Sequence, residues 1–407
     1  MKEHIQLAWR NLWRNKRRTI LTISSVFFAV FLALLMRSMQ VGTYGSMIGT
    51  VIKNTTGYIQ IHAPGYWDDK TINNTFENSE ELDETLLSTD NITSIIPRLE
   101  SFALASSGNQ TKGVAVIGTH PGIENKTTAL EKKLIRGRYF NEGKDEILLA
   151  ENLAKYLKVD TGDSIVLLSQ GYHGVTAAGE YKVIGILHFT APDMNNQLVY
   201  MRLEDAQYFY AAPNRLTSLS IMLDEPDNLA KTANTLISLL GNDYEIMTWK
   251  QMLKELMQGI QSDNISGLFM LGILYMVVAF GIFGTMLMMT MERKREFALL
   301  VSVGMQRFKL SRILFLETVF IAFIAIITGI IASIPIIWHF FKHPIRLTGE
   351  AAKAMTEFNA EPVMPFAFEW NIFLNQSIVV LILTFVAVIY PIVYVLRFNI
   401  LKAFKGK

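Results

Sequence analysis

The chain has 407 residues, half of them apolar and 18% charged, and its formal net charge is +2. A mean hydropathy of +0.26 is too high for an ordinary soluble protein of this size, so it predicts membrane segments. There is no cysteine, which excludes disulfide scaffolds, thiolate metal sites and cysteine nucleophiles.

The first 18 residues are predicted to form an amphipathic helix at a membrane surface. In MKEHIQLAWRNLWRNKRRT, apolar residues recur at helical spacing and arginines occupy the other side. Trp9 and Trp13 would lie at headgroup depth, and the arginines would lie near anionic lipid. We interpret this helix as a membrane anchor rather than as a specific binding element.

Four apolar runs approach or exceed the roughly 20 residues that a spanning helix needs. The first is short, but its uncharged flank, residues 38–48, can prolong the helix. No small-residue cleavage site follows it, so it is not expected to be a signal peptide. The predicted parts are an interfacial helix, 1–18; a first span with a stalk, 19–44; an outer domain, 45–264; a second span, 265–290; a loop, 291–312; a third span, 313–341; a short outer loop, 342–371; a fourth span, 372–396; and a tail, 397–407.

Loop charges predict the orientation of these spans. Basic residues cluster before the first span, between the second and third, and after the fourth. All three clusters fall on one side, which is cytoplasmic by the positive-inside rule. Residues 45–264 carry 28 acidic and 18 basic residues on the opposite side. We therefore expect both termini inside the cell and the large domain outside.

The outer domain is predicted to be α+β, because alternating apolar segments are interspersed with short helical ones. Residues 68–91 are expected to form a polar loop with a short helix. The pattern leaves open whether there are one or two subdomains. The predicted strands are 57–63, 113–119, 146–150, 163–169, 181–187, 216–223 and 244–249, and the predicted helices are 151–157, 203–210 and 227–240.

The connections between this domain and the spans allow two interpretations. No proline separates a helix starting near Lys250 from the second span, and none interrupts the extension of the first span. Unbroken helices would form two rigid stalks, which we favour. Alternatively, glycines would break the helices and leave the domain loosely tethered; they are Gly42, Gly45, Gly49 and Gly259.

The sequence shows no catalytic constellation, so we do not expect an enzyme. There is no G-x-x-x-x-G-K-[ST] phosphate loop, and residues 137–145 have the wrong spacing for one. The seven histidines are scattered, and Pro344 interrupts the pair His339 and His343, so no metal site is expected. Glu317 is the one acidic residue within the spans. An ion pair with a basic neighbour is favoured there over a proton relay.

The loop between the second and third spans combines a charged cluster with an apolar stripe. The charged residues are Glu292, Arg293, Lys294, Arg295 and Glu296. The stripe that follows has helical spacing: Phe297, Leu300, Val301, Gly304, Met305 and Phe308. This predicts a short helix along the inner membrane surface. It is either an anchored loop or a docking element for a cytoplasmic partner.

Four stretches resemble the FtsX-like/MacB-like ABC transporter permease family. They are LAWRNLWRNKRRTILTI near the start, IRGRYFNEGKDEILLAENLAKYLKVDTGDSIVLLS with YKVIGIL in the outer domain, ERKREFALLVSVGMQ in the loop, and YPIVYVLRFNILKAFK at the end. The third stretch is similar to the family's coupling helix, which docks on an ATPase subunit. Val301 and Ser302 replace the usual basic–alanine step, so one charged contact with the ATPase would be missing.

The resemblance implies an α-helical membrane protein with four transmembrane helices plus a large α+β extracytoplasmic domain between helices 1 and 2. It implies a non-catalytic permease in the bacterial inner membrane, paired with a second permease, the same or homologous. Two separate ATPase subunits would bind the ATP and magnesium, so this chain would bind no cofactor and no nucleic acid. The implied docking residues are Glu292, Arg293, Lys294, Arg295, Glu296, Phe297, Leu300 and Gly304.

In layout the chain is most similar to permeases of the lipoprotein-releasing Lol type. That likeness implies that a lipoprotein substrate is extracted from the bilayer and handed to a periplasmic carrier. Methionines of the second span could supply an adaptable wall for acyl chains, although ordinary packing is favoured for each. The alternatives are export of peptides, antibiotics or other hydrophobic compounds, and signalling to a cell-wall hydrolase.

Overall fold

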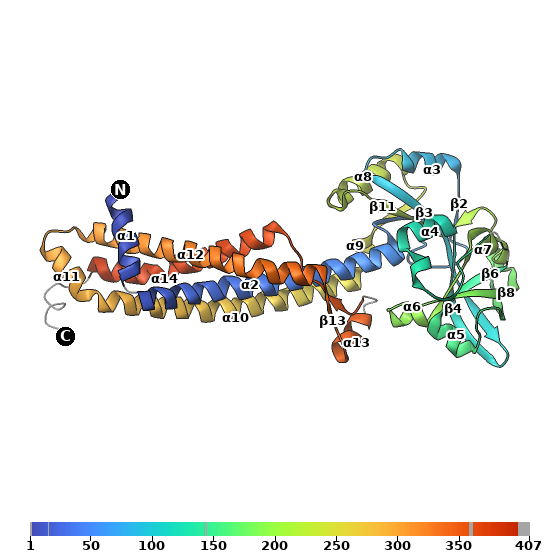
Figure 1. Ribbon diagram of the computed structural model, residues 1–407. Helices are drawn as coiled ribbons and strands as arrows, with labels where there is room; N and C mark the ends of the chain where they lie inside the picture. The colour runs from blue at the N-terminus through green and yellow to red at the C-terminus, as the bar shows by residue number, and fades with distance from the viewer. Residues whose placement is uncertain (1, 15, 142, 144, 358–360, 398–407) are drawn as a thin grey trace. The chain divides into compact units, whose positions relative to one another are not determined.

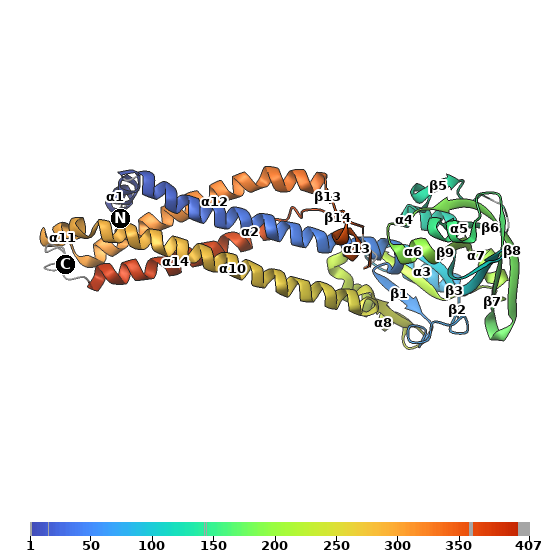
Figure 2. The same ribbon diagram turned by 90° about the horizontal axis from the view of Figure 1, so that it is seen from below.

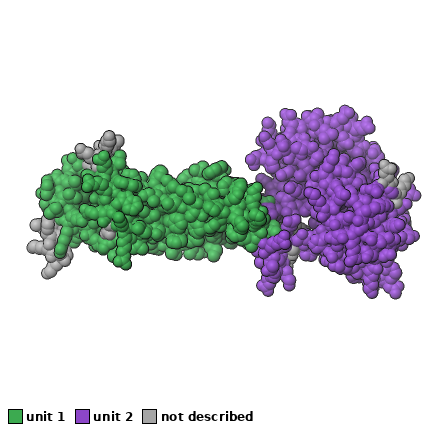
Figure 3. Space-filling model, viewed as in Figure 1, with its two compact units in different colours: residues 1–45, 260–345, 363–407 green, residues 46–259, 346–362 purple. Residues whose placement is uncertain are grey.

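The computed structural model describes residues 2–14, 16–141, 143, 145–357 and 361–397. The chain divides into two compact units, which Figure 3 distinguishes by colour. Unit 1 contains Met1–Gly45, Ile260–Ile345 and Val363–Lys407, and unit 2 contains Ser46–Gly259 and Arg346–Pro362. We call them the membrane unit and the outer domain, and each has its own apolar core.

In the part of the chain that the structure describes, the membrane unit contains four helices that are long and apolar enough to cross a membrane. They enclose a core of mainly aliphatic side chains, among them Val30, Ile282, Ile321 and Val380. Ala29 is fully buried there, so small residues let these helices approach closely. The four helices, seen in Figures 1 and 2, are α2 (Lys16–Val51), α10 (Lys254–Glu292), α12 (Arg307–Lys342) and α14 (Trp370–Arg397).

The predicted amphipathic helix is present as α1 (Lys2–Arg14). Ala8 and Leu12 are buried, and the Trp9 ring lies edge-on to Phe320 of α12, with 5.5 Å between centroids. The Thr19 hydroxyl donates to the Leu12 carbonyl at 2.6 Å. This bond ties α1 to the start of α2.

The helices at both junctions with the outer domain continue through their glycines. Gly42, Gly45 and Gly49 lie inside α2, which passes into a π-helical turn, η1 (Ile52–Thr56), and Gly259 lies inside α10. The alternative in which these glycines break the helices is therefore wrong. One bend was not expected: Leu253, with φ −104° and ψ 47°, separates a short helix, α9 (Trp249–Met252), from α10.

The outer domain contains a closed ring of six strands. The longest, β3 (Ile92–Ser107), pairs with β4 along one edge and with β7 along the other. The ring continues from β4 through β9, β6 and β8 back to β7. Inward side chains fill it with an apolar core that includes Leu99, Val116 and Leu167. The other strands are β4 (Gln110–Thr119), β5 (Leu134–Gly137), β6 (Glu146–Ala150), β7 (Ser164–Gln170), β8 (Thr176–Leu187) and β9 (Leu198–Arg202), with β5 on β8.

A second, open sheet shares β3 with the ring. Its order is β12–β1–β11–β3, and all three pairings are antiparallel. Apolar side chains of these strands pack with Leu82, Leu86 and Leu236 in a separate core. These residues belong to α3 and α8, so the domain has two subdomains joined through β3. The elements are β1 (Ile59–His62), α3 (Glu80–Leu87), β11 (Ser218–Leu223), α8 (Leu229–Leu240) and β12 (Glu245–Thr248).

All seven predicted strands are present, but β2, β3, β5, β9, β13 and β14 were missed. The region 216–223 is divided at Thr217 into a short β10 and β11. The predicted helices correspond to α5, α7 and η4 with α8, whereas α4 and α6 were not predicted. The remaining elements are β2 (Phe76–Glu77), α4 (Pro121–Thr128), η2 (Leu130–Lys133), α5 (Glu151–Leu157), η3 (Tyr172–Gly174), α6 (Pro192–Gln197), α7 (Leu203–Phe209), β10 (Arg215–Leu216), η4 (Pro226–Asn228), β13 (Ile345–Arg346), α13 (Glu350–Glu357) and β14 (Val363–Met364).

Candidate docking helix and its ion pairs

The charged loop contains a helix, as predicted. This is α11 (Lys294–Ser302), which lies between the end of α10 and the start of α12. Its first turn closes with a bond from the Phe297 amide to the Arg293 carbonyl at 2.9 Å. Only Arg293 lies between α10 and α11.

Acidic residues of the charged cluster bind arginines from the start of the chain. Glu296 pairs with Arg14 of α1, and Glu292 pairs with Arg18 at the start of α2. Arg14 and Glu296 are both about half exposed, and such pairs typically stabilise a protein by about 0–1 kcal/mol. These contacts position α11 against α1 and α2 but contribute little to stability.

Glu317 forms the ion pair that the sequence favoured. Its carboxylate accepts a hydrogen bond from Arg293 Nη1 at 2.6 Å, and the two side chains are only 5% and 15% exposed. Arg293 Nε also lies 3.5 Å from Glu296, and the guanidinium lies over the Phe297 ring, 5.1 Å from its centroid. The second Glu317 oxygen, Oε1, is buried and has no hydrogen-bond partner among the described residues. Arg293 thus lies between two carboxylates, and neither satisfies it completely.

The apolar stripe is divided between two environments: Phe297, Val301 and Met305 pack inward, whereas Leu300 and Phe308 are exposed. Phe297 is buried against Leu310, Leu314 and Val395. Val301 and Met305 pack on the same cluster, because residues four apart share a helix face. Phe297 therefore holds α11 to α12 and α14, and it is not on the surface of the chain.

A different face of α11 is exposed. Leu299 is 58% exposed and Val303 82% exposed, while Leu300 lies at the edge of this face. Arg295 and Glu296 are exposed beside them. We call Arg295, Leu299, Leu300 and Val303 the outward face. Of its members, sequence reasoning named Arg295 and Leu300 and missed Leu299 and Val303.

Gly304 ends the helix. Its φ of +103° lies where a side chain is strained. The Gly304 amide donates to the Val301 carbonyl at 3.1 Å, and the Met305 amide donates to the Leu300 carbonyl at 3.0 Å. This is the Schellman arrangement, so the predicted site residue Gly304 has a backbone role. The Ser302 hydroxyl donates to the Ala298 carbonyl at 2.8 Å.

A second polar centre, in the outer domain, was missed by sequence reasoning. Arg98 of β3 is buried and donates to Glu124 of α4 through Nε at 3.0 Å and Nη2 at 2.7 Å. Its Nη1 donates to the Thr55 carbonyl in η1 at 2.6 Å, and the Thr119 hydroxyl donates to Glu124 at 3.0 Å. The turn that follows α2 is thus fastened to the strand shared by both subdomains. The sequence offered one indication of this centre, namely a single arginine, Arg98, directly after Pro97 in an apolar run.

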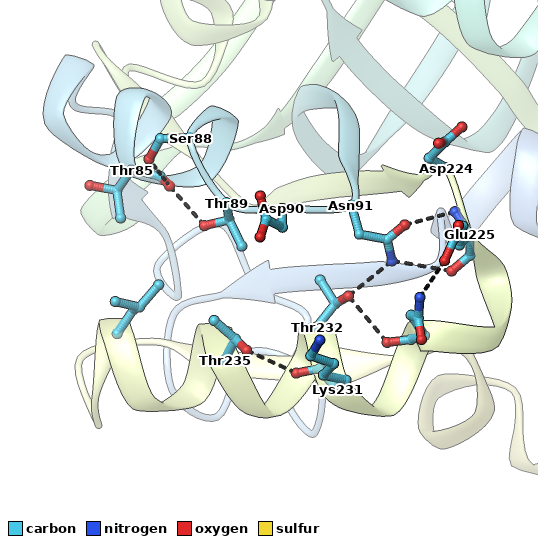
Figure 4. A pocket seen from close by; sticks show the side chains of 12 residues that line it. Thr85, Ser88, Thr89, Asp90, Asn91, Asp224, Glu225, Lys231, Thr232 and Thr235 are labelled. Atoms are coloured by element: carbon cyan, nitrogen blue, oxygen red, sulfur yellow. Dashed lines mark hydrogen bonds between the residues drawn. The ribbon is translucent and has the colours of Figure 1, made fainter.

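The chain offers little to hold a metal or cofactor. Among the described residues, no group of three or more His, Asp or Glu side chains could hold a metal ion. A groove of about 580 Å³ lies between α3 and α8. Figure 4 shows Asn91 pointing across it, where Nδ2 donates to the Thr232 hydroxyl at 3.0 Å and Oδ1 accepts from the Glu225 amide at 2.7 Å. These bonds tie the groove walls together.

Comparison with known proteins matches both units. The family model described as the MacB-like periplasmic core domain matches residues 19–239, and that of the FtsX-like permease C-terminal region matches residues 268–400. The chain is 21% identical over 252 residues to the lipoprotein-releasing system transmembrane protein LolC of Neisseria meningitidis. It is 25% identical over 252 residues to LolC of Xylella fastidiosa. Each match covers 60% of this chain and 60% of the relative.

Among solved structures, the periplasmic region of MacB from Actinobacillus actinomycetemcomitans is similar, with 18% identity and a TM-score of 0.36. The match covers 51% of this chain and 95% of that one.

Proposed function

The chain belongs to the FtsX-like permeases with a MacB-like periplasmic core domain, and we propose that a separate ATPase drives it by docking on α11. As a member of this family it is a non-catalytic membrane subunit of an ABC transporter. The observation that supports this docking most directly is the exposed outward face of α11. It presents apolar side chains and one basic side chain, while ion pairs and the buried Phe297 ring hold the helix itself.

Docking of two ATPase subunits on a pair of permeases, identical or homologous, would couple ATP hydrolysis to movement. Closure of the ATPases would displace α11, and α10 would follow because only Arg293 separates the two helices. α10 continues unbroken from Glu292 back to Lys254, so displacement of one end carries to the other. Docking of a cytoplasmic ATPase on α11 requires that α11 lies on the cytoplasmic side of the membrane. In that orientation both termini are also cytoplasmic, and the outer domain is periplasmic or extracellular.

The proposed outcome is release of lipoproteins from the inner membrane to a periplasmic carrier. Its support is the similarity to LolC proteins. Depletion of the chain in its native cell should leave mature lipoproteins in the inner membrane, measured by fractionation. Normal lipoprotein sorting after depletion would refute this substrate and favour export of peptides, antibiotics or other hydrophobic compounds.

The docking role has its own test. Leu299→Asp should abolish co-purification of the ATPase without preventing membrane insertion, because it places a charge in the outward face. A matched control is Leu239→Asp on α8, where the leucine is similarly exposed, at 55% against 58%. The role is refuted if the ATPase remains bound to the Leu299→Asp variant as it does to the control.

Phe297→Asp is unsuitable for this purpose, because it would bury a carboxylate in the packed cluster below α11 and destabilise the membrane unit.

A further inference from the structure

A cluster of polar side chains joins α2 to α10 far from α11. Arg37 Nη1 donates to Asn264 Oδ1 at 2.7 Å, and the Tyr44 hydroxyl donates to Asp263 Oδ2 at 2.5 Å. Gln40 links the two contacts: its Oε1 accepts from Arg37 at 2.7 Å, and its Nε2 donates to the Tyr44 oxygen at 2.8 Å. We call these five residues the polar clasp. Its three α2 members are spaced three and four apart, so they lie along one face of that helix.

A glycine on α10 makes room for the polar clasp. Gly267 lies directly under the Gln40 side chain, and a Cβ atom added there would collide with the Gln40 amide. Gly267 lies inside a helix with no positive φ, so its backbone does not require glycine. The close contact is with the far end of the Gln40 side chain, so a larger residue at 267 would displace that amide from its position in the polar clasp.

The neighbouring face of α2 is fastened to the segment that leads into α14. The Ser38 hydroxyl donates to the Ala367 carbonyl at 2.6 Å, and the Ala367 amide donates to the Ser38 carbonyl at 2.9 Å. One turn further on, Gly42 packs so closely on residues 365–367 that any side chain would collide with their backbone. This part of α2 is therefore held on two sides.

Apolar packing alone holds α10 weakly. In the most apolar stretch of 18 residues of α10, 11% of the residues are buried. In the corresponding stretch of the helix that contains α2, 39% are buried. The buried apolar residues of α10 are few: Ile282 and Met286 lie toward the α11 end, and Leu271 and Leu256 lie on either side of the polar clasp along the chain. Apolar contacts are also non-directional, so they resist sliding less than hydrogen bonds of fixed geometry. Near residue 264, the polar clasp is what sets the register of α10 against α2.

We propose that the polar clasp locks α2 and α10 in one register, so that the two helices leading into the outer domain shift together when α11 is displaced. Arg37, Gln40, Tyr44 and Asp263 are positioning residues for this coupling. The role rests on the proposed function, since it assigns to these residues the transfer of movement from an ATPase. The register itself does not depend on any partner.

The first experiment tests the register in the chain alone. Because the chain has no cysteine, Gln40→Cys with Gly267→Cys introduces the one pair that can cross-link. Removal of the glutamine side chain also leaves space for the new Cβ at position 267. In native membranes this pair should form a disulfide in high yield, seen as a mobility shift on a non-reducing gel. Gln40→Cys with Gly272→Cys, one to two turns away, should not. Failure of the first pair to cross-link would overturn the proposed register.

The second experiment tests the coupling in the assembled complex. In its reduced form, Gln40→Cys with Gly267→Cys lacks the Gln40 bonds to Arg37 and Tyr44 and should release less lipoprotein than the unaltered chain at similar ATPase activity. The disulfide fixes the register covalently, so it should raise lipoprotein release above that reduced level. The double variant Tyr44→Phe, Asp263→Asn should retain ATPase activity and lose at least about tenfold in lipoprotein release. Tyr208→Phe with Glu255→Gln, two exposed positions, is the matched control.

The proposal is overturned if the disulfide stops release, since the helices must then slide, or if the double variant releases lipoprotein normally. Failure of the proposed function has a different signature. In that case the unaltered chain would bind no ATPase or release no lipoprotein, whatever the cross-linking result.

Discussion

Each unit of this protein contains an arginine–glutamate pair with a buried carboxylate, and the two pairs are built differently. In the outer domain, Arg98 meets Glu124 through two hydrogen bonds and gives a third to the Thr55 carbonyl. In the membrane unit, Arg293 and Glu317 share one hydrogen bond, and among the described residues neither Arg293 Nε nor Glu317 Oε1 has a hydrogen-bond partner. A fully bonded pair specifies one geometry. The Arg293–Glu317 pair is only partly bonded, and Glu296 lies 3.5 Å from Arg293 Nε.

The difference in hydrogen bonding between the two pairs agrees with the function proposed for each unit. The Arg98–Glu124 pair lies where η1, α4 and β3 meet, so its rigidity keeps the end of α2 attached to both subdomains. The Arg293–Glu317 pair lies next to the helix that would receive an ATPase, and the Glu317 side chain is only 5% exposed, so losing Arg293 would leave its carboxylate without a partner, which is costly. The same two residue types thus form a fully bonded pair in one unit and a partly bonded pair in the other.

The largest effect is expected from breaking the fully bonded pair. Glu124→Ala leaves Arg98 buried without its carboxylate, and such a loss typically costs about 3–5 kcal/mol. The free energy of unfolding of the outer domain should fall by this amount, measured by denaturant unfolding of the purified full chain in detergent. Glu180→Ala, an exposed position on β8, should change it by less than about 0.5 kcal/mol. Equal effects of the two variants would contradict the account of the junction.

His62 extends the same buried network and makes it sensitive to acid. Its Nε2 bonds Gln60 Oε1 at 2.8 Å, and Gln60 donates to the Thr55 carbonyl at 3.3 Å. Burial, with Lys70 nearby, lowers the pKa of His62 from 6.5 to about 4. The unfolded chain takes up the proton first, so stability is full above pH 6.5 and is lost as the pH falls toward 4. The loss reaches about 3 kcal/mol.

The measurement is the free energy of unfolding between pH 7 and pH 4. His62→Gln should flatten the dependence in this window, whereas His120→Gln, at an exposed position, should leave it unchanged. If the free energy of unfolding of His62→Gln still falls between pH 7 and pH 4, the pH dependence arises from groups other than His62.

The partly bonded pair should be easier to break. Glu317→Ala is expected to cost about 1–3 kcal/mol, less than Glu124→Ala, because Arg293 is partly exposed and can turn to Glu296. Unfolding of the membrane unit in mixed detergent gives the value. Glu296→Ala removes an exposed partner and should cost about 0–1 kcal/mol. A cost for Glu317→Ala as large as that for Glu124→Ala would remove the distinction between the two pairs.

The smallest effect is expected from a substitution at the end of α11, which leaves both arginine–glutamate pairs unchanged. Gly304→Ala forces a side chain into a left-handed backbone and should destabilise the membrane unit by about 1 kcal/mol. Gly281→Ala, inside α10 with no atom within 4 Å of the new Cβ, should instead be neutral or stabilise by about 0.5–1 kcal/mol. Thermal unfolding of the two variants in detergent should therefore shift in opposite directions.

The membrane helices and most strands followed from the sequence because their signals are local. Long apolar runs and alternating segments depend on burial alone. β3 was missed even though it is the longest strand, since Pro97 interrupts its pattern and argues against a central strand. Pro97 is tolerated because it lies where β3 passes from one sheet to the other: pairing with β4 begins only at Arg98. A junction of two sheets is a tertiary feature, and no local pattern reveals it.

The charged cluster and the stripe predicted the helix that the structure shows as α11, and its docking role stays a prediction. Phe297, Val301 and Met305 of the stripe pack inward, while the exposed Leu299 and Val303 were not named. Periodicity identifies the apolar side of a helix but not what covers it. The polar clasp was missed for a related reason. Arg37, Gln40 and Tyr44 become a group only when Asp263 and Asn264, over 200 positions later, lie opposite them.

The pairing of β1 with β12 has a consequence for biosynthesis. Ile59 lies opposite Thr248 in this ladder, so the first and last strands of the domain are neighbours in one sheet. β12 is made only after nearly the whole domain has left the ribosome, and until then one edge of β1 has no partner. Pairing over such sequence distances is slow, and open strand edges invite association with other chains. The domain is thus most exposed to misassembly while its chain is being elongated. This interval ends when the segment that begins α10 has been synthesised and β12 can pair with β1.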